Sequence, residues 1–134
     1  METDPREEKA LADIQEHGCH VLYIFDENGV EPDFTYSIGI EPTSKQPELI
    51  VTGLRIELAH WIINEYNARV RAGETFAPGE RYSGFLEKAD VSYKVMSKKH
   101  YDEYLGWRIW LYRGYNFRAY QLIWPTVSGL WPTD

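Results

Sequence analysis

The spacing of apolar residues changes twice along the chain, and this change constrains the fold more than any other feature. Residues 34–40 alternate between large apolar and small or polar side chains, which is typical of a strand with one buried face. Residues 49–52 form a short continuous apolar run, as in a central strand buried on both faces. Residues 55–72 then place apolar side chains at helical spacing. A chain with both periods predicts a sheet with helices packed against it.

Other segments extend this pattern to both ends of the chain. Residues 20–25 predict a first strand, joined to the strand at 34–40 by a hairpin turn at Asn28-Gly29. The sequence also predicts a helix from Pro5 that ends before Gly18, strands at 81–86, 91–96 and 117–124, and a helix from Ser97 to about Tyr112. We therefore expect a single α+β domain over residues 1–134, with a mixed, mostly antiparallel sheet and about three packed helices. Residues 1–4 would form an N-terminal extension and residues 126–134 a C-terminal tail.

Composition argues against several classes of protein. The net charge of −7 argues against nucleic acid and anionic membrane surfaces as partners. No apolar run approaches the roughly 20 residues that cross a bilayer, and the acidic N-terminus lacks the order of a secretory signal. Cys19 is the one cysteine, which excludes an internal disulfide and suits a reducing compartment. We therefore expect a cytoplasmic protein.

His20 is the strongest candidate for chemistry. We expect it to be mostly buried and nearly opposite Tyr36 on the adjacent antiparallel strand, with Glu48 nearby. Because an imidazole titrates near pH ~6.5, this group suits proton transfer, and we predict His20, Tyr36 and Glu48 as catalytic residues. A buried histidine bonded to the backbone is the favoured structural alternative. His17 and Cys19 would add zinc-type ligands, but a tetrahedral site needs four convergent ligands, so we predict no metal.

Two pairs of residues are candidates for ligand binding. Ser44 and Lys45 lie in a predicted connection between strands, where a hydroxyl and an ammonium group can contact the phosphate of a flavin or nucleotide. A solvated loop is the favoured alternative, because phosphate-binding glycines are missing. On the last predicted strand, alternation places Trp124 on the helix-covered face and Gln121 on the opposite face. A buried Gln121 amide needs a hydrogen-bond partner or a wet pocket.

The C-terminal quarter is rich in aromatic residues. Ten of the 20 aromatic side chains lie in residues 101–134, next to several basic residues. Such a segment can supply the core or a surface for a protein partner or a second copy of the chain.

Five segments resemble a known family when taken in order. They are His17–Val21, Pro32 with Phe34–Gly39, Pro47–Leu54, Tyr101 with Tyr104-Leu105, and Gln121–Pro125. Their order and spacing resemble those of a bacterial domain-of-unknown-function family, number 4262 (DUF4262). The resemblance implies a compact cytoplasmic α+β domain and no established reaction.

Two classes of function are consistent with these features. In the leading hypothesis, a pocket between the hairpin and the C-terminal segment binds a small molecule, with a nucleotide or flavin as candidate ligand and proton transfer as candidate chemistry. In the alternative, the protein is an interaction or regulatory module, such as an immunity-like or host-factor-binding protein, that uses its aromatic C-terminal segment.

Overall fold

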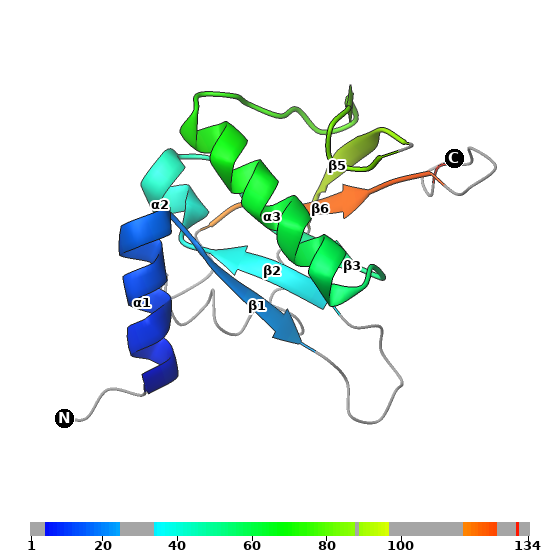
Figure 1. Cartoon of the computed structure of the whole chain (residues 1–134). Coiled ribbons are helices and arrows are strands. Elements are labelled where there is room, and N and C mark those ends of the chain that lie inside the picture. The colour runs from blue at the N-terminus through cyan, green and yellow to red at the C-terminus, as the bar shows by residue number, and fades with distance from the viewer. Residues whose placement is uncertain (1–4, 25–33, 88, 97–116, 126–130, 132–134) are drawn as a thin grey trace.

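The computed structural model describes residues 5–24, 34–87, 89–96, 117–125 and 131 (Figure 1). The helices within these ranges are α1 (Pro5–His17), α2 (Ile40–Ser44) and α3 (Ile56–Arg71). The strands are β1 (His20–Ile24), β2 (Phe34–Ile38), β3 (Glu48–Thr52), β4 (Arg81–Tyr82), β5 (Val91–Val95) and β6 (Ala119–Ile123). The predicted α+β fold is therefore confirmed.

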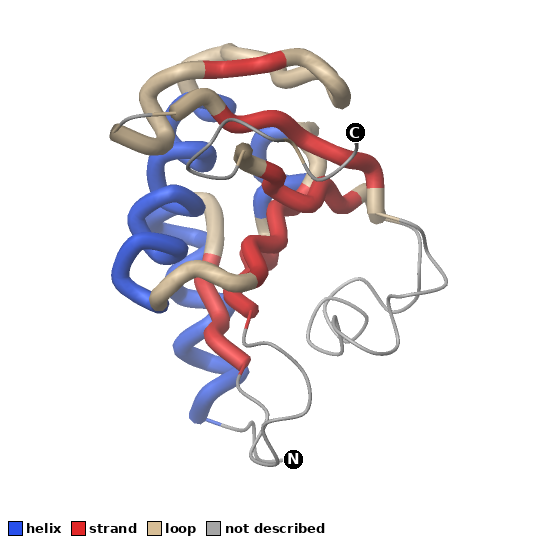
Figure 2. Tube along the Cα trace, turned by 90° about the vertical axis from the view of Figure 1, so that its right-hand side faces the viewer, coloured by secondary structure: helices blue, strands red, loops and turns tan. Residues whose placement is uncertain are grey.

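The strands form one mixed sheet with the order β1-β2-β3-β6-β5-β4. The β3–β6 pair is parallel, whereas the other paired strands are antiparallel. Helix α3 lies across the sheet in Figure 1, and Figure 2 shows the helical layer beside the strands. As the continuous apolar run predicts, β3 is central, with β2 on one side and β6 on the other.

The core consists of two clusters, one on each face of the sheet. Alternation along β3 separates them, since Leu49 and Val51 belong to the cluster under α3 and Ile50 belongs to the other. The α3 cluster also contains an aromatic group, in which the Tyr66 and Tyr93 rings lie 5.7 Å apart. Ala10 of α1 is buried in the second cluster. Both faces of β3 are thus shielded from water, which explains its apolar run.

Gly18 ends α1 at the position that the sequence predicts. Gly18 follows α1 with φ +91°, and its amide donates to the Ile14 carbonyl at 2.9 Å. A positive φ is accessible to glycine at low cost, so the chain leaves the helix here and enters β1.

Two local predictions differ from the structure. The connection around Ser44 and Lys45 is not an open loop but contains α2, a helix of five residues. The strand predicted at 81–86 stops after Tyr82, because the chain turns at Gly84 with φ +92°. The predicted turn at Asn28-Gly29, the predicted helix at 97–112, and all of the predicted tail except Trp131 lie outside the described residues.

The described helices are too short or too polar for a transmembrane span.

Candidate functional site

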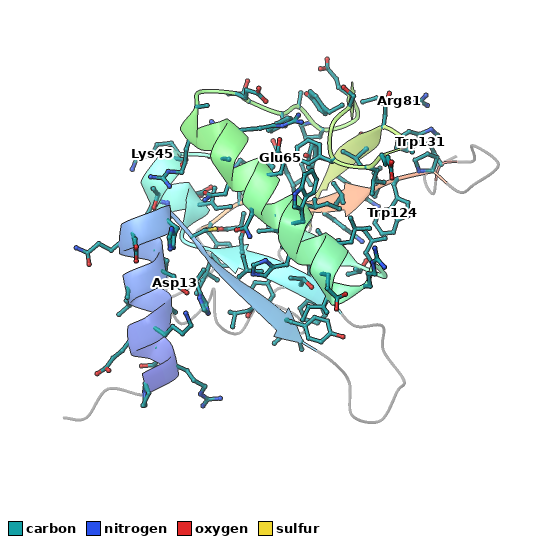
Figure 3. All side chains as sticks on the ribbon, viewed as in Figure 1. Asp13, Lys45, Glu65, Arg81, Trp124 and Trp131 are labelled. Carbon is teal, nitrogen blue, oxygen red and sulfur yellow. The ribbon has the colours of Figure 1, made fainter. Side chains whose placement is uncertain are left out.

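A polar cleft opens at the β1 edge of the sheet, between α1 and α3. Its volume is about 560 Å³. Figure 3 shows Asp13 on the α1 side of this region. The lining residues come from α1, the α1–β1 junction and α3: Lys9, Asp13, His17, Cys19, His20, Val21, His60, Asn64, Asn67, Ala68 and Arg71. The cleft therefore gathers three of the four histidines in the chain.

The central feature of the cleft is a carboxylate–imidazole pair. His20 Nδ1 donates to Asp13 Oδ2 at 2.7 Å, and the His20 side chain is 13% exposed. Lys9 Nζ lies 3.2 Å from the same oxygen. Partial burial tends to raise the pKa of the Asp13 carboxyl, but the hydrogen bonds from His20 and Lys9 outweigh this effect and lower its pKa from the ordinary value of 3.8. Asp13 is therefore ionised near neutral pH and accepts a hydrogen bond from His20.

The other wall of the cleft is a polar stripe on α3. His60, Asn64, Asn67 and Arg71 recur at intervals of three or four residues and so lie on one face of the helix. Asn64 Nδ2 donates to His60 Nδ1 at 3.0 Å. This stripe gives the cleft several hydrogen-bonding groups that the apolar core does not use.

Two residues of this stripe tie α3 to the end of α1. Asn67 Nδ2 donates to the His17 carbonyl at 2.9 Å, and Arg71 Nη1 donates to the same oxygen. A helix leaves its last carbonyls without internal partners, so these side chains satisfy one of them. Asn67 Oδ1 is buried and has no hydrogen-bond partner in the described part of the chain. The two hydrogen bonds to the His17 carbonyl hold α1 and α3 at a defined separation.

Cys19 lies beneath the cleft and is 4% exposed. Burial, together with the negative charge of Glu48, raises the pKa of the Cys19 thiol to about 12, although Arg71 partly opposes this shift. The neutral thiol is a poor nucleophile and a poor metal ligand. The part of the chain that the structure describes contains no group of three or more histidine, cysteine or acidic side chains that could hold an ion.

His20 and Tyr36 lie on neighbouring antiparallel strands, but they are not directly opposite. His20 pairs with Ile38, while Leu22 pairs with Tyr36, so the two residues are offset by two positions on one face. Tyr36 is buried in the second cluster, with its ring stacked beside Phe34 at 5.8 Å. His20 lines the cleft, whereas Tyr36 does not.

Glu48 is fully buried at 0% exposure and is bound at the start of α2. Its Oε1 accepts from the Ser37 hydroxyl at 2.8 Å and from the Ile40 amide at 3.1 Å. Its Oε2 accepts from the amides of Gly39 at 3.0 Å and Glu41 at 3.2 Å. The first amides of a helix lack internal acceptors, so this distant carboxylate caps α2. The arrangement gives Glu48 a structural role and keeps it out of the cleft lining.

The predicted ligand-binding residues are spread over the fold rather than gathered in this cleft. Ser44 is at the end of α2, and its buried Oγ has no hydrogen-bond partner among the residues that the structure describes. Lys45 is exposed, with φ 61°, and its ammonium group donates to the Pro42 carbonyl at 3.2 Å. In β6, Gln121 is half-buried, and beyond its end Trp124 packs against the α3 cluster. The face assignment made for Gln121 and Trp124 is confirmed.

Sequence reasoning did not identify Asp13 or the α3 stripe. Asp13 and His20 are seven residues apart on either side of a helix end, so neither helical nor strand spacing relates them. A signal for the stripe exists, because His60 and Asn64 are four residues apart beside the apolar face of a predicted helix.

One of the comparisons with known proteins, that with protein-family models, agrees with the resemblance described above. No curated protein and no solved structure matches the chain significantly. The family model described as "Domain of unknown function (DUF4262)" matches residues 13–134. This match begins at the aspartate that binds His20 and covers β1 to β6 and all of α3. The chain therefore belongs to the DUF4262 family.

Proposed function

We propose that the protein binds a small molecule in the cleft between α1 and α3 and that His20 is its proton-transfer group. The observation that carries this proposal is the 2.7 Å contact between His20 Nδ1 and Asp13 within a polar cleft. The cleft volume of about 560 Å³ falls in the range of small-molecule sites. Nucleotides and flavins are the ligands to be tested first.

The Asp13 contact defines the chemistry available to His20. A carboxylate bound to Nδ1 favours the tautomer with a proton on that nitrogen, which makes Nε2 the basic atom. The same carboxylate stabilises the imidazolium that forms when Nε2 takes up a proton. Since its pKa is lowered, Asp13 stays ionised near neutral pH. The pair thus supports general base catalysis on a ligand bound in the cleft.

Thermal stability in the presence of candidate ligands tests this proposal. A compound at about ten times its Kd stabilises the fold by about 1.4 kcal/mol, which raises the Tm of a domain of this size by several degrees. We expect at least one nucleotide, flavin or common metabolite at about 1 mM to raise the Tm of the wild type. His20→Gln should reduce this shift. Arg55→Gln, a change at an exposed residue outside the cleft, should leave it intact.

Two results would count against the proposal. One is a screen in which no compound raises the Tm. The other is a screen in which every compound gives the same shift in the wild type and His20→Gln, because binding would then not depend on the cleft imidazole. If instead the protein captures a protein partner or forms a homodimer, the interaction-module hypothesis gains support. That hypothesis concerns residues 101–134, most of which lie outside the described part of the chain.

The cellular setting belongs to the same proposal. We place the protein in a bacterial cytoplasm, as the family resemblance implies. The single cysteine, which is buried as a free thiol, is consistent with a reducing compartment. Fractionation of cells that express the full chain tests this assignment, and recovery in the membrane or periplasmic fraction would contradict it.

A further inference from the structure

A second cavity lies on the sheet face opposite α3, at the β4 end of the sheet. Its volume is about 450 Å³, and its described lining includes two basic side chains and no acidic one. The lining residues are Pro78, Gly79, Arg81, Ser92, Tyr93, Lys94, Val95, Ile123 and Trp131. Figure 3 labels Arg81 and Trp131 side by side, far from Asp13. The cavity is thus separate from the α1–α3 cleft.

Strand register places the polar groups of this cavity on one face. Arg81 of β4 pairs with Ser92 of β5, so their side chains are direct cross-strand neighbours. Lys94 is two residues beyond Ser92 and therefore lies on the same face. Gln121 of β6 pairs with Lys94 and extends this face toward the sheet centre. Val91 and Tyr93, which alternate with these residues, belong to the α3 cluster, so the polar face is the opposite one.

Ser92 is the most informative residue of this face. It is 3% exposed, and its Oγ has no hydrogen-bond partner among the described residues. Packing alone favours an apolar residue at such a position, since a buried hydroxyl without a partner destabilises the fold. Ser92 lines the cavity, opposite Arg81 on β4 and two residues before Lys94, and its hydroxyl has a proton to donate to an anionic ligand.

The two cations are available for a ligand. Neither Arg81 nor Lys94 has a carboxylate partner among the residues that the structure describes, and both are exposed. The Arg81 guanidinium stacks over the Trp131 ring at 4.5 Å from its centroid. Stacking fixes the guanidinium plane while its N–H edge stays able to bind an oxyanion with two hydrogen bonds. The indole also offers an apolar wall for the rest of a ligand.

We propose that this cavity binds a small molecule through a phosphate or carboxylate group, held by Arg81, Lys94 and the Ser92 hydroxyl. Trp131 and Ile123 pack against the uncharged part of the ligand. The site is independent of the proposed proton-transfer cleft, and neither proposal requires the other.

The indole N–H resonances of the ¹⁵N-labelled full chain provide the test, with phenyl phosphate as the probe. Trp131→Phe assigns the resonance of Trp131 among the five tryptophans. We expect phenyl phosphate to shift this resonance saturably and inorganic phosphate to compete. Arg81→Gln and Lys94→Gln should each weaken binding about tenfold or more, because each removes a charged hydrogen-bond donor. Ser92→Ala should weaken it by a smaller factor.

Matched controls separate this site from general attraction to charge. Arg6→Gln removes one positive charge from an exposed position on α1 and should leave the affinity unchanged, as should His20→Gln in the other cleft. Benzyl alcohol, which has a similar ring but no charge, should not compete. The proposal is overturned if phenyl phosphate gives no saturable shift, if Arg6→Gln weakens binding as much as Arg81→Gln, or if benzyl alcohol binds as tightly as phenyl phosphate.

Discussion

The Glu48 carboxylate is expected to contribute more to stability than any surface charge, because three buried donors and one partly buried donor converge on it. These donors are the Ser37 hydroxyl and the amides of Gly39, Ile40 and Glu41. Glu48→Ala leaves all four without this acceptor. At about 1 kcal/mol for each of these donors, the free energy of unfolding should fall by up to about 4 kcal/mol. This is a large part of the roughly 5–15 kcal/mol that holds a domain together.

A second substitution separates the loss of hydrogen bonds from the loss of volume. Glu48→Gln keeps the shape of the side chain and one carbonyl oxygen, but its NH₂ group faces a backbone donor. The Ser37 hydroxyl donates to Oε1 and accepts from the Leu49 amide in the wild type. A hydroxyl oxygen can accept two hydrogen bonds, so it can turn and also accept from the new NH₂ group. We therefore expect a loss of about 2 kcal/mol, intermediate between wild type and Glu48→Ala.

Urea unfolding followed by tryptophan fluorescence gives the stabilities, and amide hydrogen exchange locates the effect. The amides of residues 39–41 should exchange faster in Glu48→Ala, with little change in the middle of α3. Glu16→Ala, on the exposed surface of α1, is the matched control and should stay within about 0.5 kcal/mol of wild type. Equal urea midpoints for Glu48→Ala and Glu16→Ala, with unchanged exchange at 39–41, would refute the assignment of Glu48 as the cap of α2.

Three further predictions follow from the same structure. The Cys19 thiol, with its pKa raised to about 12, should resist iodoacetamide at about pH 8 in the folded protein and react after unfolding in urea; rapid native labelling would contradict its burial. Asp13→Asn should destabilise the fold at about pH 7, and the difference should shrink as the pH falls below 3.8, because a lowered carboxyl pKa contributes stability only while the group is ionised; urea midpoints that differ equally at about pH 7 and pH 3 would contradict this. Gly39→Ala should lower the free energy of unfolding by at least about 2 kcal/mol, because φ is +100° and a Cβ would lie 2.6 Å from Ile14 Cγ1. Gly73→Ala should lower it by only about 1 kcal/mol, because Gly73 has φ +101° but open space around it. Equal losses of Tm in the two variants would show that the Ile14 contact is unimportant.

Elements with a local cause could be predicted from the sequence. Gly18 ends α1, alternation predicts β2, the apolar run predicts β3, and helical spacing predicts α3. Each of these sequence signals lies within its element or directly beside it. Helix α2 could not be predicted in this way, because its capping group Glu48 comes after the helix and belongs to β3. A pattern read in short windows does not relate the first residues of a helix to a later strand.

The candidate site shows the same limit. His20 stood out because its residue type carries chemistry, and the predicted strand placed it correctly beside β2. Its partner Asp13 lies on the preceding helix, and the opposite wall lies on α3, some 40 to 50 residues later. Only the packing of α1 and α3 against the sheet edge brings these groups together. Residue type thus identified one member of the site, whereas tertiary structure determined the rest.

The place of β6 in the sheet has a consequence for how the chain acquires its structure during synthesis. This last strand lies between β3 and β5, so it joins the β1-β2-β3 half to the β4-β5 half (Figure 1). Until residues 119–123 leave the ribosome, β3 has an unpaired apolar edge, and such edges promote aggregation. The parallel β3–β6 pairing also spans about 70 residues of sequence, which slows closure. The sheet must therefore remain incomplete, with the β3 edge exposed to aggregation, until residues 119–123 have been made.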